Sequence, residues 1–389
     1  MDHKEPDRVP VDLGSTPSSG ISAISYNRLK GFLGIPDGTC RIYDVVQQLA
    51  EPELTVIDRL GVDVLDVGRA FNVDGSGWHP TTLSDGSRAE YPRWFDPSRE
   101  ADGATFFDQT CFPYVDGYPA DFRGLARAMA KVHWAALAHS PWDCAGDEGF
   151  WGLLRENALA LRRGSDRALM IVCGCNLFEW GTFLRRLDNF LMDLYVDRAG
   201  AERLLDALLE VHLATLDKVC AAVGDVADVL RFGDDLGFDA GPFMPPEIYR
   251  ELFKPRHAAL CRYVKTHSRM RTFLHSCGGI APLIPDLIEA GFEALNPVQT
   301  SANGMDPVVL KREFGRDVTF WGGGADTRRV LNFASPREVK RHVVERLSIL
   351  SPGGGFVFAA VHNIMPDVPP ANAAAMFEAV SEFNGGKGA

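Results

Sequence analysis

Short apolar segments alternate with longer amphipathic segments along most of the chain, and this alternation is the main structural signal in the sequence. The apolar segments are rich in β-branched and aromatic residues and end near Gly, Pro or Asn, which is typical of strands. They lie at residues 9–14, 63–68, 168–174, 228–235, 271–278, 292–299, 318–326 and 355–363. Their nearly continuous apolar character predicts parallel strands that are covered on both faces.

The segments between the predicted strands have the spacing and the end signals of helices. Residues 246–267 and 335–350 are two examples. Ser335 is a good N-cap for the second helix, because Pro336 occupies the first helical position and Glu338 follows three residues after the cap. A glycine-rich segment ends that helix. Eight strands that alternate with helices predict an α/β fold, a (β/α)8 TIM barrel.

We expect one domain over residues 1–389, because a single barrel can reach this length with an N-terminal extension. The pattern is less regular in residues 69–120, where Asp85-Gly86 predicts a hairpin turn. We interpret residues 69–120 as an insertion over the barrel mouth. Its aromatic residues and prolines suit a lid, and they suit an ordinary packed loop equally well.

Composition narrows the class of protein. Forty basic residues against fifty-two acidic residues give a net charge of −12, which argues against a nucleic-acid or anionic-membrane partner. No apolar run approaches the roughly 20 residues of a membrane span, and the N-terminal segment has no apolar signal core. Eight cysteines without regular spacing do not indicate a disulfide framework. We therefore expect a cytoplasmic protein.

Polar residues gather where the predicted strands end, which is where barrel enzymes place their functional groups. In chain order they are Asp234, Asp235, His275, Cys277, Asn296, Gln299, Asp326, His362 and Asn363. We predict that Asn296, Gln299, Asp326 and Asn363 contact a substrate.

His275-Ser276-Cys277 is the strongest local signal for a metal. Residues i and i+2 of a strand point to the same side, so the imidazole and the thiolate converge, and both are good zinc ligands. His362 ends strand eight and is the predicted third ligand, which leaves a fourth position for substrate or water. The alternative is that Cys277 is a small buried hydrophobe and His362 a hydrogen-bonding residue.

Asp234 and Asp235 are the candidate acids of the site. Adjacent strand residues point to opposite sides, so only one of the two can face the mouth fully, and we favour Asp235. The alternative is structural: the two carboxylates cap the next helix or pair with Arg231, or the Asp235 carboxylate caps the turn at Gly237.

Three segments resemble the uroporphyrinogen decarboxylase superfamily, and more closely its branch of corrinoid-dependent methyltransferases. They are FLHSCGGIAPLIPDLIEAGFEALNPVQ, FWGGGADTRRVL and VFAAVHNIMPDVPPAN. RFGDDLGFDAGPFMPPEIYRELFKPRH and NFLMDLY extend the match, which is most specific in residues 228–372. The resemblance implies a TIM barrel, which the strand pattern predicts independently.

The resemblance also separates two chemistries. Decarboxylases of the family carry an arginine-rich, MRQAGR-like segment after the first strand, whereas this chain has GSTPSSGIS. The methyl-transferring relatives bind zinc through H-x-C and a distant cysteine. His275 and Cys277 match the first part, and His362 stands where that cysteine would be. The predicted ligand set therefore departs from the family pattern and becomes His2Cys.

The predicted function is methyl transfer between a small-molecule donor or acceptor and a corrinoid, with zinc as the second cofactor. The chain has no D-x-H-x-x-G motif, so the cobalamin must come on a partner protein. A homodimer is left open. The alternative function is a cofactor-free decarboxylase in which Asp235 stabilises a protonated intermediate. A non-enzymatic binding barrel would leave the polar strand ends unexplained.

Overall fold

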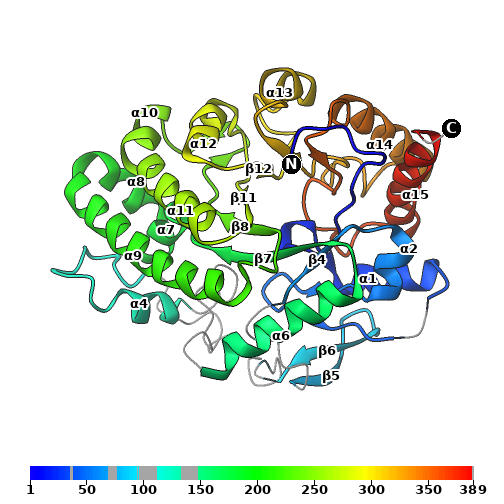
Figure 1. Cartoon of the computed structure of the whole chain (residues 1–389), viewed down its shortest axis with the longest axis horizontal. Coiled ribbons are helices and arrows are strands. Elements are labelled where there is room, and N and C mark those ends of the chain that lie inside the picture. The colour runs from blue at the N-terminus through cyan, green and yellow to red at the C-terminus, as the bar shows by residue number, and fades with distance from the viewer. Residues whose placement is uncertain (36–37, 69–76, 94, 96–111, 133–147, 388–389) are drawn as a thin grey trace. The chain divides into compact units, whose positions relative to one another are not determined.

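The computed structural model describes residues 1–35, 38–68, 77–93, 95, 112–132 and 148–387. Contacts within the chain divide it into two compact units. Unit 1 comprises Met1–Asp66, Gly75–Phe95 and Glu293–Ala389. Unit 2 comprises Val67–Asp74 and Asp96–Phe292. Figure 1 labels many of the helices and strands of both units.

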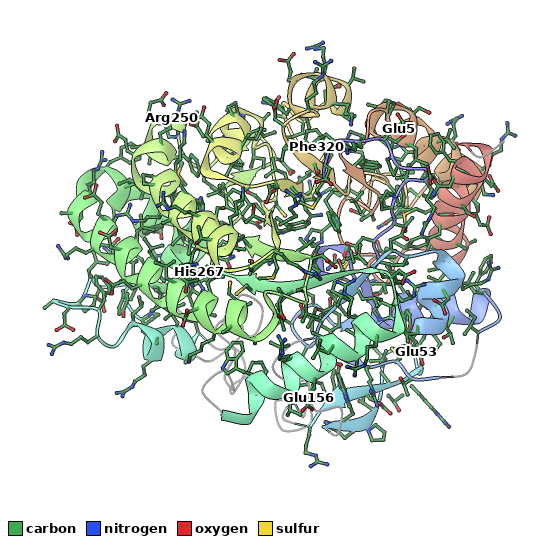
Figure 2. The ribbon with its side chains drawn as sticks, in the orientation of Figure 1. Glu5, Glu53, Glu156, Arg250, His267 and Phe320 are labelled. Atoms are coloured by element: carbon green, nitrogen blue, oxygen red, sulfur yellow. The ribbon has the colours of Figure 1, made fainter. Side chains whose placement is uncertain are left out.

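Unit 1 contains a row of parallel strands. They are β4 (Val64–Asp66), β12 (Ala294–Asn296), β13 (Thr319–Trp321) and β14 (Phe356–Val357). Phe320, labelled in Figure 2, is buried in β13 and pairs in parallel with Leu295 and Phe356. Beyond β14, Val11 forms a parallel bridge with Phe358 and accepts a hydrogen bond from the Asp63 N–H at 2.7 Å. Residues 9–13 therefore take the place of a strand between β14 and β4.

Helices and short antiparallel pairs complete unit 1. The helices are η1 (Pro17–Ser19), α1 (Ala23–Phe32), α2 (Leu54–Leu60), α13 (Pro307–Phe314), α14 (Pro336–Leu350) and α15 (Pro370–Lys387). The further strands are β1 (Ile21–Ser22), β2 (Ile42–Asp44), β3 (Leu49–Ala50), β5 (Trp78–Thr82) and β6 (Arg88–Pro92). Helices α14 and α15 pack side by side, as Figure 1 shows.

Unit 2 contains three long parallel strands, β7 (Ala168–Gly174), β8 (Val229–Gly233) and β11 (Arg271–His275). Val229 of β8 pairs with Met170 on one side and with Arg271 on the other. All residues of β8 are buried, which agrees with a sequence that is apolar except for Arg231. A small antiparallel pair, β9 (Gly237–Phe238) and β10 (Gly241–Pro242), follows β8.

Helices connect the strands of unit 2. They are α4 (Leu125–Lys131), α6 (Glu148–Gly164), α7 (Phe178–Arg185), α8 (Leu187–Val196), α9 (Arg198–Val223), α10 (Pro246–Ile248), η3 (Tyr249–Phe253), α11 (Lys254–His267), η4 (Ala281–Leu283) and α12 (Ile284–Ala290). Helices α9 and α11 lie side by side (Figure 1). The helix predicted over residues 246–267 is present, but η3 is a π-helical turn immediately before Pro255. Proline lacks an N–H and crowds the preceding turn, which favours such a wider turn.

The sequence prediction of the fold is confirmed: the class is α/β, of the (β/α) TIM-barrel type. Seven of the eight predicted segments contain a strand, which in several is shorter than predicted, and segment 9–14 contains the bridge at Val11. The capping box of Ser335 and Glu338 is present at the start of α14. The predicted hairpin is β5–β6, with Asp85 and Gly86 in its turn.

The interpretation of residues 69–120 as a lid stays a prediction, because residues 69–76, 94 and 96–111 lie outside the described residues. The single-domain boundary also stays a prediction. Among the described residues, no helix has both the length and the apolar character that crossing a membrane requires.

Candidate functional site

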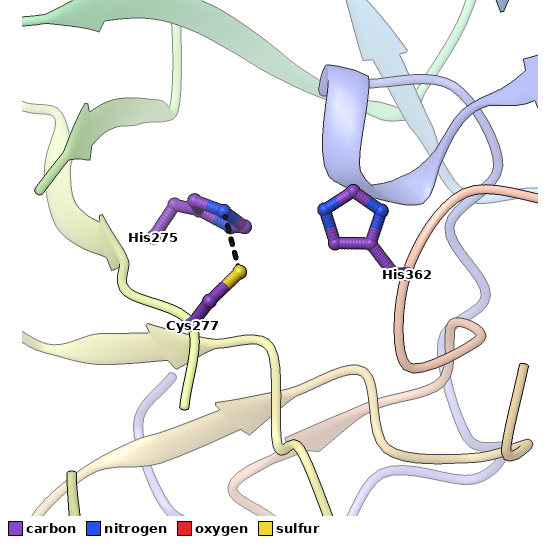
Figure 3. Close-up of side chains that lie close together, drawn as sticks. All are labelled: His275, Cys277 and His362. Atoms are coloured by element: carbon purple, nitrogen blue, oxygen red, sulfur yellow. Dashed lines mark hydrogen bonds between the residues drawn. The ribbon is translucent and has the colours of Figure 1, made fainter. Parts of the chain in front are cut away.

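The end of β11 brings His275 and Cys277 together. Figure 3 shows the two side chains, whose Nε2 and Sγ atoms lie 3.4 Å apart. The His275 side chain is 8% exposed, and Cys277 is partly exposed. Gly278 follows with a φ of +90°, so the chain turns sharply just after the thiol. The predicted convergence of these two side chains is therefore present.

The spacing of the pair fits one zinc ion. Tetrahedral bonds of about 2.3 Å to sulfur and about 2.05 Å to nitrogen place the two ligand atoms about 3.6 Å apart. The observed separation of 3.4 Å needs almost no adjustment. His275 and Cys277 can thus serve as two ligands of the same metal ion.

Asp235 fixes the loop that carries the thiol. Its Oδ1 accepts a hydrogen bond from the Cys277 N–H at 2.9 Å and lies 3.5 Å from Nε2 of His275. The Asp235 side chain is 35% exposed, so it is accessible from solvent as well as from the pair. The structural alternative for Asp235 was a turn contact at Gly237, whereas the observed backbone contact of its carboxylate is with Cys277.

Asp234 has a different environment and is fully buried. Its two carboxylate oxygens accept the N–H groups of Phe178 and Glu179 at 3.0 and 2.9 Å, at the start of α7. Nε2 of His257 lies 3.2 Å from the same carboxylate. A carboxylate at a helix N-terminus satisfies otherwise unpaired donors and interacts favourably with the helix dipole. The sequence alternative was a cap on the next helix, whereas the helix that Asp234 caps is α7, which precedes β8 in the chain.

Glu179 and Asn176 belong to the site although the sequence analysis did not select them. Oε2 of Glu179 accepts hydrogen bonds from Nδ2 of Asn176 and from the N–H of Asp235. Both residues follow β7, the third predicted strand. The sequence prediction covered polar residues only at the ends of strands four to eight. The segment CNLFE carries that polar signal, so the same reading at strand three would have found them.

Burial and negative charge govern the protonation of this site. Desolvation raises the pKa of Glu179 well above its usual value, and the neighbouring Asp235 and Asp234 raise it further. The pKa of the Cys277 thiol is also well above its usual value, first because of burial and then because of Asp235 and Glu179. In the protein without metal, both groups therefore favour their neutral forms.

His362, the third predicted ligand, lies in unit 1 on the loop after β14 and is labelled in Figure 3. Its Nδ1 is 2.7 Å from Oδ1 of Asn363, whose Nδ2 donates to Oε1 of Gln47 at 2.9 Å. Because that Oδ1 can only accept, Nδ1 carries the proton and the lone pair is on Nε2. The contact with Asn363 thus leaves Nε2 as the ring nitrogen of His362 that can accept a hydrogen bond or act as a ligand.

The other predicted substrate contacts of unit 1 have structural partners. Asn296 is 1% exposed, accepts a hydrogen bond from the Ser18 hydroxyl and donates to the Trp321 carbonyl at 2.9 Å. Asp326 accepts the N–H groups of Arg328 and Arg329 and so holds its own turn. Gln299 is buried. Contact of these residues with a substrate stays a prediction.

The turn after the first extended segment contains hydroxyl groups and no arginine. Residues 14–22 are buried. Thr16 and Ser18 hydroxyls are 2.8 Å apart, and the Ser19 hydroxyl donates to the Thr16 carbonyl at 3.2 Å. Asp12 accepts a hydrogen bond from Nε1 of Trp321 at 2.8 Å, and burial raises its pKa. This turn therefore offers no cation that could bind an anionic substrate.

The Uroporphyrinogen decarboxylase (URO-D) family model matches residues 179–383, which is more than half of the chain. The chain belongs to the uroporphyrinogen decarboxylase family. The matched segment begins at Glu179 and includes Asp235, His275, Cys277 and His362. The arginine-free first turn lies outside it.

A solved structure described as a methyltransferase from Methanosarcina mazei has a similar fold. The TM-score is 0.59 at 19% sequence identity, and the similarity covers 97% of this chain and 95% of the other. No curated protein matches the chain. The structural likeness extends over nearly the whole length of both proteins and supports the TIM-barrel assignment for this member of the family.

Proposed function

We propose that this member of the family is a zinc-dependent methyltransferase. In this proposal, it moves a methyl group between a small substrate and a corrinoid carried by a partner protein. The observation that carries the proposal is the pair of His275 and Cys277, whose ligand atoms lie 3.4 Å apart in an arrangement suited to zinc. The similar fold of a protein described as a methyltransferase supports the same reaction class.

The proposed ligands are His275, Cys277 and His362. His275 and Cys277 belong to unit 2 and His362 belongs to unit 1, and each side chain offers one ligand atom of a kind that zinc binds. Three protein ligands leave a fourth position for substrate or water, which is typical of catalytic rather than structural zinc. One thiolate and two neutral imidazoles make a more electrophilic zinc than two thiolates would.

When bound, zinc would supply Lewis acidity and would keep the Cys277 thiol deprotonated despite its raised pKa. Asp235 is close enough to the pair to orient a substrate or to exchange a proton with it. Asn296, Gln299, Asp326 and Asn363 remain the proposed substrate contacts. Asp234, by contrast, supports the site through α7 and His257.

The corrinoid is proposed to arrive on another protein, because the chain has no D-x-H-x-x-G cobalamin motif. The small substrate would be the methyl donor or the methyl acceptor. The negative net charge of −12 supports neither nucleic acid nor an anionic membrane as a partner.

A cofactor-free decarboxylase is the second candidate, favoured by one observation. Burial and two neighbouring acids hold Glu179 in its neutral form, and a neutral carboxylic acid can donate a proton to a carbanion left by loss of CO2. That reaction needs no metal. Zinc content therefore separates the two candidates.

The test is metal analysis by mass spectrometry of protein purified without chelators. We expect about one zinc per chain, and strongly reduced zinc in Cys277→Ala, His275→Ala and His362→Ala. Cys220→Ala is the matched control, because Cys220 is a buried thiol of α9 outside the proposed site. Full zinc content in Cys277→Ala, or a metal-free wild-type protein after zinc supplementation, would contradict the proposal and favour the decarboxylase.

A further inference from the structure

A chain of hydrogen bonds connects the end of β7 to the end of β11 in unit 2. Nδ2 of Asn176 donates to Oε2 of Glu179, and the same oxygen accepts the Asp235 N–H at 3.0 Å. Oδ1 of Asp235 then accepts the Cys277 N–H at 2.9 Å and lies 3.5 Å from His275 Nε2. Glu179 therefore contacts the backbone of Asp235 directly. The carboxylate of Asp235 in turn contacts both proposed zinc ligands.

Glu179 is itself held firmly at two points. Its backbone N–H donates to Oδ1 of Asp234, while its side chain accepts from the next residue, Asp235. The start of α7 and the end of β8 are thus tied to each other in both directions. Asn176 is also fixed, because its carbonyl accepts a hydrogen bond from Nε2 of His212 at 2.8 Å.

The side chain of Asn176 packs closely against Gly233 at the end of β8. A Cβ at Gly233 would lie 3.0 Å from Nδ2 of Asn176 and 2.9 Å from a guanidinium nitrogen of Arg231. These contacts are tighter than ordinary van der Waals distances. The Asn176 amide therefore lies directly against the backbone at the end of β8.

We propose that Glu179 is a positioning residue for the zinc site: it holds Asp235 so that Asp235 aligns His275 and Cys277. This role rests on the proposed function. Oε2 of Glu179 accepts hydrogen bonds from two N–H groups. The role therefore depends on the length of the side chain and on this accepting oxygen. Outer residues that orient metal ligands typically alter metal affinity 10- to 100-fold when they are lost.

Three variants separate reach, acceptor and the titratable carboxyl group. Glu179→Gln keeps the length and an accepting oxygen but replaces the carboxyl group with an amide. Glu179→Asp keeps the carboxyl group but shortens the side chain by one methylene, so it no longer reaches the Asp235 N–H. Glu179→Ala removes the acceptor. If the alanine variant fails to fold, the aspartate variant still tests the role.

The first readout is zinc affinity, measured by competition with a chromophoric chelator. We expect about 10- to 100-fold weaker binding in Glu179→Ala and Glu179→Asp, and a change within about threefold in Glu179→Gln. The cobalt-substituted protein should show a shifted thiolate-to-cobalt absorption band in the first two variants. Asp286→Asn is the control for a purely structural loss, because Asp286 is a buried acid of α12 paired with Arg250 and Lys254.

The second readout needs no metal: the rate at which iodoacetamide alkylates Cys277 in the apo protein, followed by peptide mass spectrometry. Among the described cysteines, Cys277 alone is partly exposed. A changed rate in Glu179→Ala and Glu179→Asp, with Glu179→Gln and Asp286→Asn near wild type, supports the positioning role.

The two proposals fail in different ways. If the wild-type protein binds zinc but all Glu179 variants match it in both readouts, the positioning role is wrong and the zinc site stands. If the wild-type protein binds no zinc, the proposed function fails, and the alkylation rates alone decide whether Glu179 positions the Cys277 loop. Equal effects of Asp286→Asn and Glu179→Ala would reduce the role to general stability and overturn it.

Discussion

Asp234 and Asp235 are adjacent in sequence, yet their carboxylates have different roles because they lie on opposite sides of the chain. Asp234 is fully buried and accepts hydrogen bonds from the first turn of α7. Asp235 is partly exposed and contacts the Cys277 backbone. Of the two carboxylates, that of Asp235 is therefore the one that solvent or a bound substrate can reach for proton exchange.

We predict that Asp235→Asn lowers turnover in a methyl-transfer assay by about 10²- to 10⁴-fold, the usual cost of losing a positioned acid or base. Asparagine keeps an oxygen that can accept the Cys277 N–H, so the loop should retain its shape. The melting temperature should therefore change little. A lower melting temperature with per-molecule activity near wild type would instead assign Asp235 a structural role.

The sequence allowed the prediction of His275 and Cys277 because a period of two places them on one side of an extended chain. The partners of that pair were harder to predict. Glu179 reaches Asp235 through tertiary structure, and its sequence position at the start of a helix is also typical of an ordinary solvated acid. The capping of α7 by Asp234 was not predicted, because the alternative concerned the next helix and a cap supplied by a distant strand has no local spacing.

At the level of elements, the Cys277 loop depends on close contact with the β9–β10 hairpin. A Cβ at Gly278 would lie 2.3 Å from the carbonyl carbon of Gly237 and 2.4 Å from the N atom of Phe238. Gly278 also has a φ of +90°, which side-chain-bearing residues rarely adopt. The backbone of the hairpin and the backbone of the loop thus approach each other at a position where only glycine fits.

We predict that Gly278→Ala lowers the free energy of unfolding by at least about 3 kcal/mol, because it combines strain in φ with a backbone clash. It should also reduce zinc content by displacing Cys277. Gly61→Ala is the matched control: Gly61 has a φ of +65° with nothing within 4 Å of an added Cβ. The control should lose only about 1 kcal/mol in urea unfolding. Equal losses in the two variants would show that the clash is relieved without cost.

Helix α9 carries a titratable group that makes stability depend on pH. His212 is fully buried, and its Nε2 hydrogen-bonds the Asn176 carbonyl. Desolvation lowers its pKa from 6.5 to about 4. The folded protein therefore keeps His212 neutral at pH values where the unfolded chain already binds a proton. The stability that this provides is complete above pH 6.5 and is lost as the pH falls toward 4.

We predict that between pH 7.5 and pH 4.5 the wild-type protein loses about 2–3 kcal/mol more unfolding free energy than His212→Gln does. Glutamine can donate to the Asn176 carbonyl and does not titrate. Urea unfolding of both proteins across this pH range provides the measurement. Parallel pH profiles would mean that His212 is protonated in the folded state as readily as in the unfolded chain.

Most helices and strands could be predicted from the sequence, because residues at their ends signal where they begin and stop. Ser335 and Glu338 form the capping box that begins α14, and the glycines after Leu350 adopt left-handed conformations that end it. The π-helical turn before Pro255 was not predicted, because the apolar spacing continues through it. The short pairs β1–β3 and β2–β3 were missed because strands of two or three residues have no measurable period.

At the level of the whole molecule, family membership alone does not determine the substrate. The family model matches residues 179–383, which hold the acids and the proposed zinc ligands. The first turn, which lies outside that segment, is made of buried hydroxyl-bearing residues that bond to one another. A barrel can keep its strands while its loops change, so the reaction follows the loops more closely than the fold.

We predict that the protein does not decarboxylate uroporphyrinogen. A substrate with several carboxylates needs charge-assisted hydrogen bonds, which arginine supplies best. Residues 14–22 contain no arginine. The Arg123 side chain is 90% exposed and forms an ion pair with Asp121. Arg69 lies outside the described residues. Chromatography of reaction mixtures should therefore show coproporphyrinogen at the level of the enzyme-free control. Formation of coproporphyrinogen at a rate typical of the decarboxylases would contradict the prediction. It would mean that arginines elsewhere in the chain bind the substrate and that the protein is a uroporphyrinogen decarboxylase.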